Sequence, residues 1–395
     1  MSMEIKCPGF RAAGVAAAIK QANRLDMGLI VSDVPAAVAG IFTKNKIKAA
    51  PVLMDMQRVQ SGSAQAIVVN AGNANCCTGA QGMGDAMEMA ALVADSLGIS
   101  RELVLVSSTG VIGKSMPMDR ISAAIPRLVA GLSYQGIMAV AKAFMTTDTV
   151  PKAISSQGII DGKVFTLTGI IKGAGMIRPD MATMLCYILT DAKAPPGFLK
   201  NALIAAANIS FNRASVDGDT STNDTVLLLA NGVSGIQIES SEHEAVFQEV
   251  LNALCLKLAK AMIRDGEGVN KLVDLMVKGA LTDADAYRVA ETVGHSPLVK
   301  TALFGEDANW GRIVAAVGRA GVEIEPEKID IYFDQVQLLQ NTRWCGAQAE
   351  AEATEVMRQS EYALRIDLNM GSGSAQLITC DFSMDYVRIN ADYRT

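Results

Sequence analysis

The segment 172–192, KGAGMIRPDMATMLCYILTDA, constrains the fold of this chain more than any other stretch. Glycine and proline in its first half oppose a regular helix. Its second half is an unbroken apolar run from Met184 to Leu189, which is typical of a short strand buried on both faces. Thr183 is therefore predicted to lie where a tight loop enters a core strand.

This position suits a threonine that acts as a nucleophile. A hydroxyl group needs an adjacent base, and a threonine at a new N-terminus can use its own α-amine for this purpose. An α-amine has a pKa near ~8, so part of it is neutral at working pH. Taken from the residue pattern alone, Thr183 is more simply a threonine that begins a strand behind a glycine turn.

Composition predicts a large core and excludes several classes of function. The 395 residues suggest two lobes, and 50% of them are hydrophobic while 19% are charged, which favours apolar contacts between subunits. A net charge of −6 argues against a nucleic-acid binder. No apolar run approaches the roughly 20 residues of a membrane span. The N-terminus lacks the apolar core of a secretory signal, so we expect a cytoplasmic protein.

Metal and nucleotide cofactors are not predicted. The seven cysteines are scattered without CxxC spacing and indicate a reducing compartment, and the two histidines, His243 and His295, have no partner at metal-ligand spacing. The polar segment SVDGDTSTNDT from Ser215 lacks the residue order of a calcium loop and is interpreted as a hydrogen-bonded loop near the site. No GxGxxG or GKS loop is present.

Two strand ends carry residues that could line a site. An apolar strand ends at Ser107 and is followed by Thr109 and Gly110, a turn that could present a hydroxyl and an amide to an oxyanion. Many strands end in this way, so the pattern is weak by itself. The asparagine and glycine loop that follows a strand at 66–69 could equally be a ligand loop or a structural turn.

Alternating strand and helix patterns fill the rest of the chain. We expect further strands at 27–32, 36–42, 226–229, 329–334, 363–369 and 375–380, and a hairpin at 158–171 turning at Asp161-Gly162. We expect helices at 82–97, 116–132, 136–144, 196–208, 242–263, 283–293 and from about Asn309, which Asp307 is expected to cap.

Long motifs spread over essentially the whole chain resemble the ornithine acetyltransferase family, also called glutamate N-acetyltransferases. The central segment is similar to the self-cleavage segment of that family, in which the chain breaks between Ala and Thr of an ATML sequence. The other motifs are NAGNANCCTGAQG from Asn70, SSTGVIG from Ser107, MTTDTVPK from Met145, SVDGDTSTNDT from Ser215, FGEDANWGR from Phe304 and RINADYRT at the C-terminus.

The resemblance implies a role for individual residues. It makes Thr183 the nucleophile, freed by cleavage after Ala182, and gives the oxyanion hole to Thr109 and Gly110. It implies substrate binding by Thr146, Lys172, Thr183, Glu267, Asn390 and Thr395. Without the family, Lys172 and Glu267 would be interpreted as exposed loop residues. The threonines and the aspartate of MTTDTVPK would be interpreted as a solvated loop that caps a helix, and the C-terminal residues as a frayed tail.

The family also implies the fold and the reaction. The fold is a layered α/β sandwich with two lobes, similar to N-terminal nucleophile hydrolases but differently connected, and it is cut into fragments 1–182 and 183–395. The reaction is a ping-pong acetyl transfer from N2-acetyl-L-ornithine to L-glutamate, with acetyl-CoA as a second donor in some members. No resident cofactor is implied, and the fragments are expected to assemble as a heterotetramer with two copies of each.

Two other classes of function are weighed against this one. An aminopeptidase or amidohydrolase with the same nucleophile would pass the acyl group to water. A binding protein for small amino acids would keep an intact chain and would release no ornithine. The length and specificity of the motifs favour the acetyltransferase.

Overall fold

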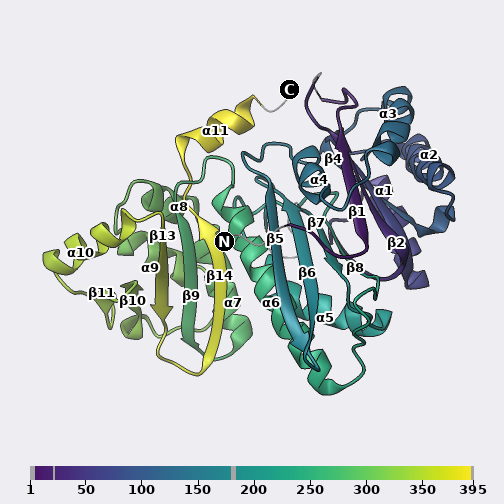
Figure 1. The fold of residues 1–395 in the computed structure, drawn as a ribbon. Coiled ribbons are helices and arrows are strands. Elements are labelled where there is room, and N and C mark those ends of the chain that lie inside the picture. The colour runs from purple at the N-terminus through teal and green to yellow at the C-terminus, as the bar shows by residue number, and fades with distance from the viewer. Residues whose placement is uncertain (1–4, 21–22, 179–183, 393–395) are drawn as a thin grey trace. The chain divides into compact units, whose positions relative to one another are not determined.

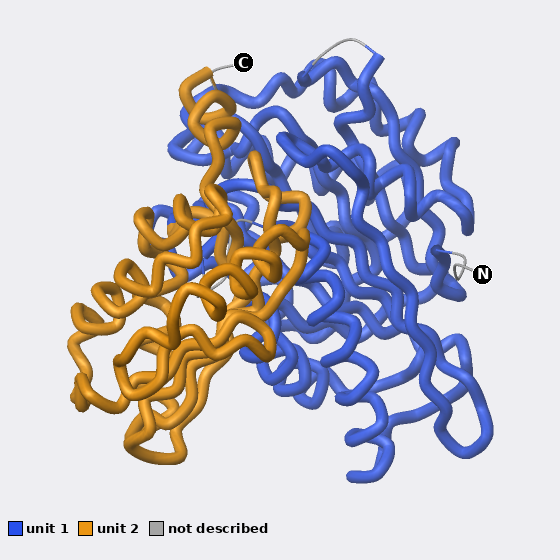
Figure 2. Tube along the Cα trace, turned by 90° about the vertical axis from the view of Figure 1, so that its left-hand side faces the viewer, with its two compact units in different colours: residues 1–212, 219–262 blue, residues 213–218, 263–395 orange. Residues whose placement is uncertain are grey.

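The computed structural model describes residues 5–20, 23–178 and 184–392 (Figure 1). Ala182, Thr183 and Thr395, to which the sequence assigns functions, lie outside the described residues. The chain forms two compact units (Figure 2). Unit 1 comprises residues 1–212 and 219–262, and unit 2 comprises residues 213–218 and 263–395.

Unit 1 is built, within the described residues, on an eight-stranded sheet in the order β4-β3-β2-β8-β7-β6-β5, with β1 paired to β2. Its strands are β1 (Phe10–Val15), β2 (Met27–Phe42), β3 (Ser63–Asn73), β4 (Val104–Val111), β5 (Lys152–Ile160), β6 (Lys163–Lys172), β7 (Leu185–Thr190) and β8 (Thr225–Ala230). The pairs β3/β4 and β7/β8 are parallel and the other neighbours are antiparallel. The sheet is therefore mixed.

Both faces of this sheet are covered, because successive side chains of a strand point to opposite faces. Ile67 and Val69 of β3 share one apolar cluster with α4 (Ile137–Ala143). Ala66 and Val68 share another with α2 (Gly79–Leu97) and α3 (Met118–Ala130). Helices α1 (Ala50–Arg58), α5 (Pro196–Ile209) and α6 (Ser241–Arg264) complete the unit, except that α6 enters unit 2 from Ile263 on.

The middle of the sheet is formed by β7 and β8, and every residue of both strands is buried. This confirms the prediction of a core strand after Met184. On the β6 side, Lys172 is paired with Leu185, and on the other side β8 pairs with β2. The predicted fragment 183–395 therefore supplies two central strands, between β2 and β6 of the fragment 1–182.

Helix α6 packs against β6 through aromatic and small residues. The rings of Phe165 and Phe247 stack with their centroids 5.7 Å apart. A Cβ atom at Gly169 would come within 2.5 Å of Cδ1 of Leu258, so a larger residue there would require the Leu258 side chain to shift.

Unit 2 contains, in its described part, a six-stranded sheet in the order β12-β11-β10-β13-β9-β14. Strands β9 and β13 pair in parallel and the other neighbours are antiparallel. The strands are β9 (Leu272–Ala280), β10 (Asp330–Phe333), β11 (Val336–Gln340), β12 (Arg343–Trp344), β13 (Glu361–Asp367) and β14 (Gly373–Cys380), and the helices are α7 (Asp283–Gly294), α8 (Pro297–Phe304), α9 (Trp310–Gly318), α10 (Ala347–Met357) and α11 (Met384–Ala391). One apolar cluster joins the sheet to α7.

The prediction of a layered α/β fold is confirmed, and so are many of its local signals. Gly98 ends α2 in the left-handed conformation with φ +67°, as expected of a C-cap glycine. The hairpin of β5 and β6 turns at Asp161 and Gly162, which both have positive φ. The strands predicted at 27–32 and 36–42 form one strand, β2, whose pairing register with β3 shifts between Val31 and Ala36.

Two local predictions were wrong. Strand β4 continues to Val111, so Thr109 and Gly110 lie inside the strand and not in a turn after it. The cap of α9 is Asn309, whose side chain accepts the backbone N–H of Arg312, and not Asp307. Residues 386–391, which the pattern without the family would assign to a frayed tail, belong to helix α11, capped by Ser383.

Candidate active site

Lys172, the last residue of β6, contacts two other predicted site residues of unit 1, Thr146 and Thr109. Its side chain is buried, and its Nζ donates a hydrogen bond of 2.7 Å to Oγ1 of Thr146. The same Nζ lies 3.5 Å from Oγ1 of Thr109. A buried ammonium group beside two hydroxyls can stabilise a substrate carboxylate or a developing oxyanion.

Asp148 supports this cluster and lies in the same loop as Thr146. Its carboxylate pairs with Lys152 at 2.7 Å and accepts the backbone N–H groups of Thr146 at 2.9 Å and Gly173 at 2.8 Å. Burial on its own raises the pKa of Asp148, but the ammonium groups of Lys172 and Lys152 outweigh it and hold that pKa well below its usual range. Asp148 is therefore an anionic support for the loop.

Gly110 is required by the close approach of two strand ends. It has φ +133° and is paired with Gly72 of β3. A Cβ atom at position 110 would lie 2.3 Å from the carbonyl carbon of Gly72, so only glycine fits. The backbone at Gly110, directly after Thr109, therefore carries no side chain.

An asparagine network links the polar motifs of the sequence. The side-chain amide of Asn223 donates to the carbonyl oxygens of Ala74 at 2.7 Å and Ser108 at 2.8 Å. The Ser108 hydroxyl donates in turn to Oδ1 of Asn70 at 2.6 Å. Segments far apart in the chain thus meet at the ends of β3 and β4, and the interpretation of this part of the loop as hydrogen-bonded is confirmed.

Asp224 is a residue that sequence reasoning missed. It is buried just before β8, and its Oδ1 accepts the backbone N–H of Met184 at 3.1 Å. Among the described residues, Oδ2 has no hydrogen-bond partner, and burial raises the pKa of the carboxyl well above its ordinary value. It belongs to the motif SVDGDTSTNDT, in which no local pattern distinguishes it from Asp217 and Asp219.

Lys20 was missed as well. It follows β1, and its Nζ donates a hydrogen bond to the carbonyl oxygen of Met145, the residue before Thr146. Burial, together with the positive charges of Arg24 and Lys172, lowers the pKa of Lys20 to about 7. In the sequence it resembles any surface lysine.

Unit 2 brings together two further predicted residues. The side-chain amide of Asn390 in α11 donates to Oε2 of Glu267 at 2.8 Å. The two segments pack closely, because a Cβ atom at Gly268, which has φ +69°, would lie 2.5 Å from Oγ of Ser383. The substrate-binding roles of Glu267 and Asn390 stay predictions.

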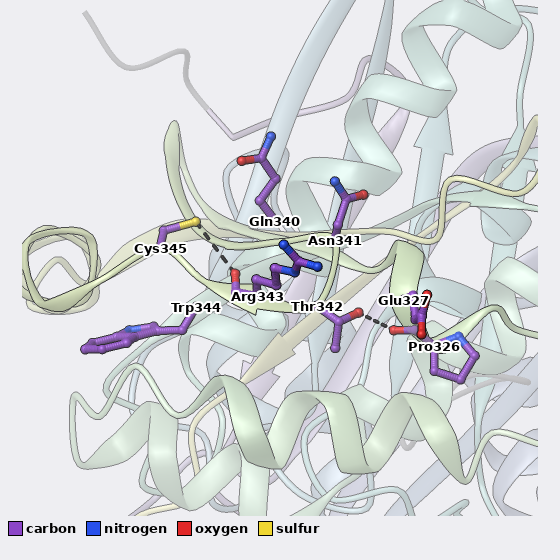
Figure 3. A pocket seen from close by; sticks show the side chains of 8 residues that line it. All are labelled: Pro326, Glu327, Gln340, Asn341, Thr342, Arg343, Trp344 and Cys345. Carbon is purple, nitrogen blue, oxygen red and sulfur yellow. Dashed lines mark hydrogen bonds between the residues drawn. The ribbon is translucent and has the colours of Figure 1, made fainter.

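A separate open cavity of about 850 Å³ in unit 2 contains none of the predicted site residues (Figure 3). Within it, the Thr342 hydroxyl donates to the carbonyl oxygen of Pro326, and Sγ of Cys345 lies 3.9 Å from the carbonyl oxygen of Arg343. Its lining residues are Pro326, Glu327, Gln340, Asn341, Thr342, Arg343, Trp344 and Cys345. Its polar groups belong to a hairpin edge, and they do not resemble the predicted chemistry.

The part of the chain that the structure describes holds neither a cluster of metal ligands nor a helix suited to span a membrane. There, no group of three or more His, Cys, Asp or Glu side chains is placed to hold a metal ion. Over the same described ranges, no helix combines the length and the apolar character that a membrane crossing requires. All seven cysteines are described, and each is a free thiol.

The mixed sheet with helices on both faces defines an α/β protein, and its buried cluster of lysine and threonine is suited to bind a small anionic group. The sequence profile of the ArgJ family matches residues 11–395, and the chain belongs to this family. The resemblance inferred from the motifs is thereby confirmed.

Known relatives match over nearly the full length. The chain is 52% identical to the arginine biosynthesis bifunctional protein ArgJ of Geobacter sulfurreducens, over 98% of this chain and 99% of the relative. It is 49% identical to the protein of the same name from Syntrophotalea carbinolica, over 99% of this chain and 100% of the relative. A crystal structure of ArgJ from Bacillus halodurans, 42% identical, matches with a TM-score of 0.50 and covers 52% of this chain and 97% of that chain.

Proposed function

We propose that this chain transfers the acetyl group of N2-acetyl-L-ornithine to L-glutamate, giving L-ornithine and N-acetyl-L-glutamate in arginine biosynthesis. The observation that carries the proposal is the buried contact of Lys172 with Thr146 and Thr109, three residues that the motifs assign to one site. Both substrates are small and anionic at their α-carboxylate, which suits a buried ammonium group among hydroxyls.

In the first half of the reaction, Oγ1 of Thr183 attacks the acetyl carbonyl carbon while the α-amine of Thr183 takes the hydroxyl proton. The oxyanion receives hydrogen bonds from the Thr109 hydroxyl and the Gly110 amide, and Lys172 adds a positive charge nearby. The carbon–nitrogen bond then breaks, and the α-amine returns the proton to the departing nitrogen of ornithine. An acetyl ester of Thr183 remains.

In the second half, the neutral α-amine of glutamate attacks the ester carbonyl. Its excess proton passes to the α-amine of Thr183, and from there to Oγ1 as the ester carbon–oxygen bond breaks. N-acetylglutamate leaves and the free threonine is restored, so atoms and charges balance without a resident cofactor.

The same hydroxyl would free its own α-amine. Oγ1 of Thr183 attacks the carbonyl carbon of Ala182, the peptide bond gives way to an ester, and water hydrolyses this ester to leave Ala182 with a carboxylate. Support comes from the crystal structure of the Bacillus halodurans relative, whose chain is matched over 97% of its length but covers only 52% of this one. A relative cut into two fragments of comparable size would give this result, because each of its chains would correspond to about half of the present chain.

The wider setting is part of the proposal. The description of the relatives as bifunctional supports acetyl-CoA as a second acetyl donor, used as a substrate. The hydrophobic share of 50% supports assembly of the two fragments into a heterotetramer of two copies each. A biosynthetic enzyme of free amino acids belongs in the cytoplasm.

The test combines intact mass with substrate turnover. The purified protein should give two species under denaturing conditions, one of which begins at Thr183. With N2-acetyl-L-ornithine alone it should release one equivalent of ornithine per site, and it should release more only as acetylglutamate forms. Thr183→Ala should stay a single chain of 41.6 kDa and lose transfer, whereas the control Thr354→Ala in α10 should match the wild type. Cleaved or active Thr183→Ala would refute the mechanism, and acetate released without glutamate would show a hydrolase.

A further inference from the structure

Lys20 is held in a built site and not on a mobile surface loop. The carboxylate of Asp26, itself fully buried, accepts the backbone N–H groups of Ala17 and Ile19 at 2.6 Å each and of Lys20 at 3.1 Å. Three such bonds fix the direction in which the Lys20 side chain leaves the backbone. The backbone of residues 17–20, after β1, is thereby tied to Asp26 at the start of β2.

The side chain of Lys20 runs across the backbone next to the predicted oxyanion hole. A Cβ atom at Gly72 would lie 2.7 Å from Cγ of Lys20, so the lysine stem rests on this glycine. Gly72 is the pairing partner of Gly110. Glycine at position 72, which has φ +101°, is therefore needed both for the backbone and for the passage of the lysine.

The amine of Lys20 then reaches the loop that carries Thr146. It donates to the carbonyl oxygen of Met145, while Lys172 donates to the hydroxyl of Thr146 at 2.7 Å. Two ammonium groups from β6 and from the β1–β2 loop thus contact consecutive residues. Arg24 adds a third cation, 3.4 Å from the carbonyl oxygen of Thr146.

The carboxylates around Lys20 are already engaged. Both oxygens of Asp26 accept backbone N–H groups, and Asp148 pairs with Lys152 at 2.7 Å and with Lys172 at 3.9 Å. Among the described residues, no carboxylate forms an ion pair with Lys20. A partly desolvated cation beside other cations is stabilised by an anion, and the low pKa of Lys20 reflects this need.

In the proposed reaction, the α-carboxylate of the substrate is such an anion. N-acetylornithine and glutamate share an α-carboxylate, two bonds from the nitrogen that carries or receives the acetyl group. If the acetyl oxygen of a substrate lies at Thr109 and Gly110, its α-carboxylate therefore lies only a few ångströms away. Lys172 is in that region, since its Nζ lies 3.5 Å from Oγ1 of Thr109.

We propose, on the basis of the proposed acetyl transfer, that Lys20 is a further substrate-binding residue that holds, together with Lys172, the α-carboxylate shared by donor and acceptor. The site takes α-amino acids and their N-acyl derivatives with a free α-carboxylate. It discriminates against α-amides and α-esters, because these offer no carboxylate to the half-buried ammonium group of Lys20.

The experiment compares N2-acetyl-L-ornithine with its α-carboxamide in the wild type, Lys20→Gln and Lys20→Arg. Gln keeps a donor for Met145 and loses the charge. A charge-assisted hydrogen bond is worth about 10- to 100-fold in binding, so Lys20→Gln should raise KM for the acid by about that factor, with a smaller effect on kcat. The ratio of kcat/KM for acid over amide should fall about tenfold in Lys20→Gln and be largely kept in Lys20→Arg.

The matched control is Lys142→Gln, which removes an exposed lysine in α4 and should leave all parameters at wild-type values. An unchanged ratio of acid over amide in Lys20→Gln overturns the inference even if overall activity falls, because a packing role would affect both substrates equally. If Lys20→Gln fails to fold, Lys20→Met removes the charge in its place: an unchanged ratio of acid over amide overturns the inference, and a fall of about tenfold supports it. A wild type that transfers no acetyl group would instead refute the proposed function.

Discussion

The ammonium group of Lys172 lies 2.7 Å from the hydroxyl of Thr146, although the two residues are 26 positions apart in the chain. Lys172 ends β6, and Thr146 lies in the loop before β5, which pairs with β6. The pairing of β5 with β6 therefore brings the loop that carries Thr146 next to the end of β6, where Lys172 lies. Four perturbations test how this arrangement works.

Thr109→Ala removes a hydroxyl that is predicted to stabilise the oxyanion. Loss of one such donor should lower kcat by about 10²- to 10³-fold with little change in KM, because the bond forms only in the transition state. Initial rates of ornithine release measure the effect, and Thr109→Ser, which keeps the hydroxyl, is the control. Wild-type turnover in Thr109→Ala would remove Thr109 from the mechanism.

Gly110→Ala should disrupt the end of β4. The added Cβ would meet the backbone of Gly72 at 2.3 Å with φ at +133°, and neither strand can move without breaking its pairing. We expect a loss of several kcal/mol in the free energy of unfolding, because backbone strain and overpacking add. Gly84→Ala, at an exposed helical glycine with open space around it, should stabilise α2 by about 0.5 to 1 kcal/mol. Urea unfolding followed by circular dichroism compares the two, and equal stabilities would contradict the packing argument.

Asp148→Asn should destabilise unit 1 by about 3 to 5 kcal/mol at neutral pH, since it leaves buried ammonium groups without their carboxylate. The folded protein depresses the pKa of Asp148, so its contribution is complete above the ordinary aspartate pKa of ~4 and declines as the pH falls below that value. The difference between wild type and variant in urea midpoints should therefore shrink on acidification. Asp95→Asn, which breaks an exposed pair with Arg101, should cost less than ~1 kcal/mol. A difference independent of pH would argue against the ion pair.

Binding of L-ornithine should weaken as the pH rises, because Lys20 binds the carboxylate only when protonated. Burial and the charges of Arg24 and Lys172 lower its pKa to about 7, while Asp26 and Asp148 act in the opposite direction. Calorimetry between about pH 6 and 9 should show this loss in the wild type and a flatter profile in Lys20→Arg, since arginine stays protonated over the whole range. Parallel profiles would show that another group titrates.

Periodicity and turn chemistry predicted most of the fold. The run from Met184 to Leu189 forms a fully buried strand, and Gly98 ends α2, because both signals are local and act through hydrophobic burial or backbone conformation. The end of β4 was misjudged, since its extension to Val111 depends on parallel pairing with β3, a contact between distant segments. No local pattern contains that information.

The site was predicted mainly through motifs. Lys172, Thr109 and Thr146 are brought together, and Glu267 meets Asn390, but none of these contacts could be derived from spacing. Lys20 and Asp224 escaped notice because their partners, Met145 and Met184, offer only backbone atoms, which carry no signature in a sequence.

The order β2-β8-β7-β6 has a consequence for how such an enzyme can be made. If residues 1–182 and 183–395 were translated from separate genes, the first product would expose β2 and β6 as unpaired edges, and the second would expose β7 and β8, all rich in apolar residues. Unpaired edges of this kind associate with one another and aggregate. This strand order favours folding as one polypeptide, and the proposed cut at Ala182 would follow folding.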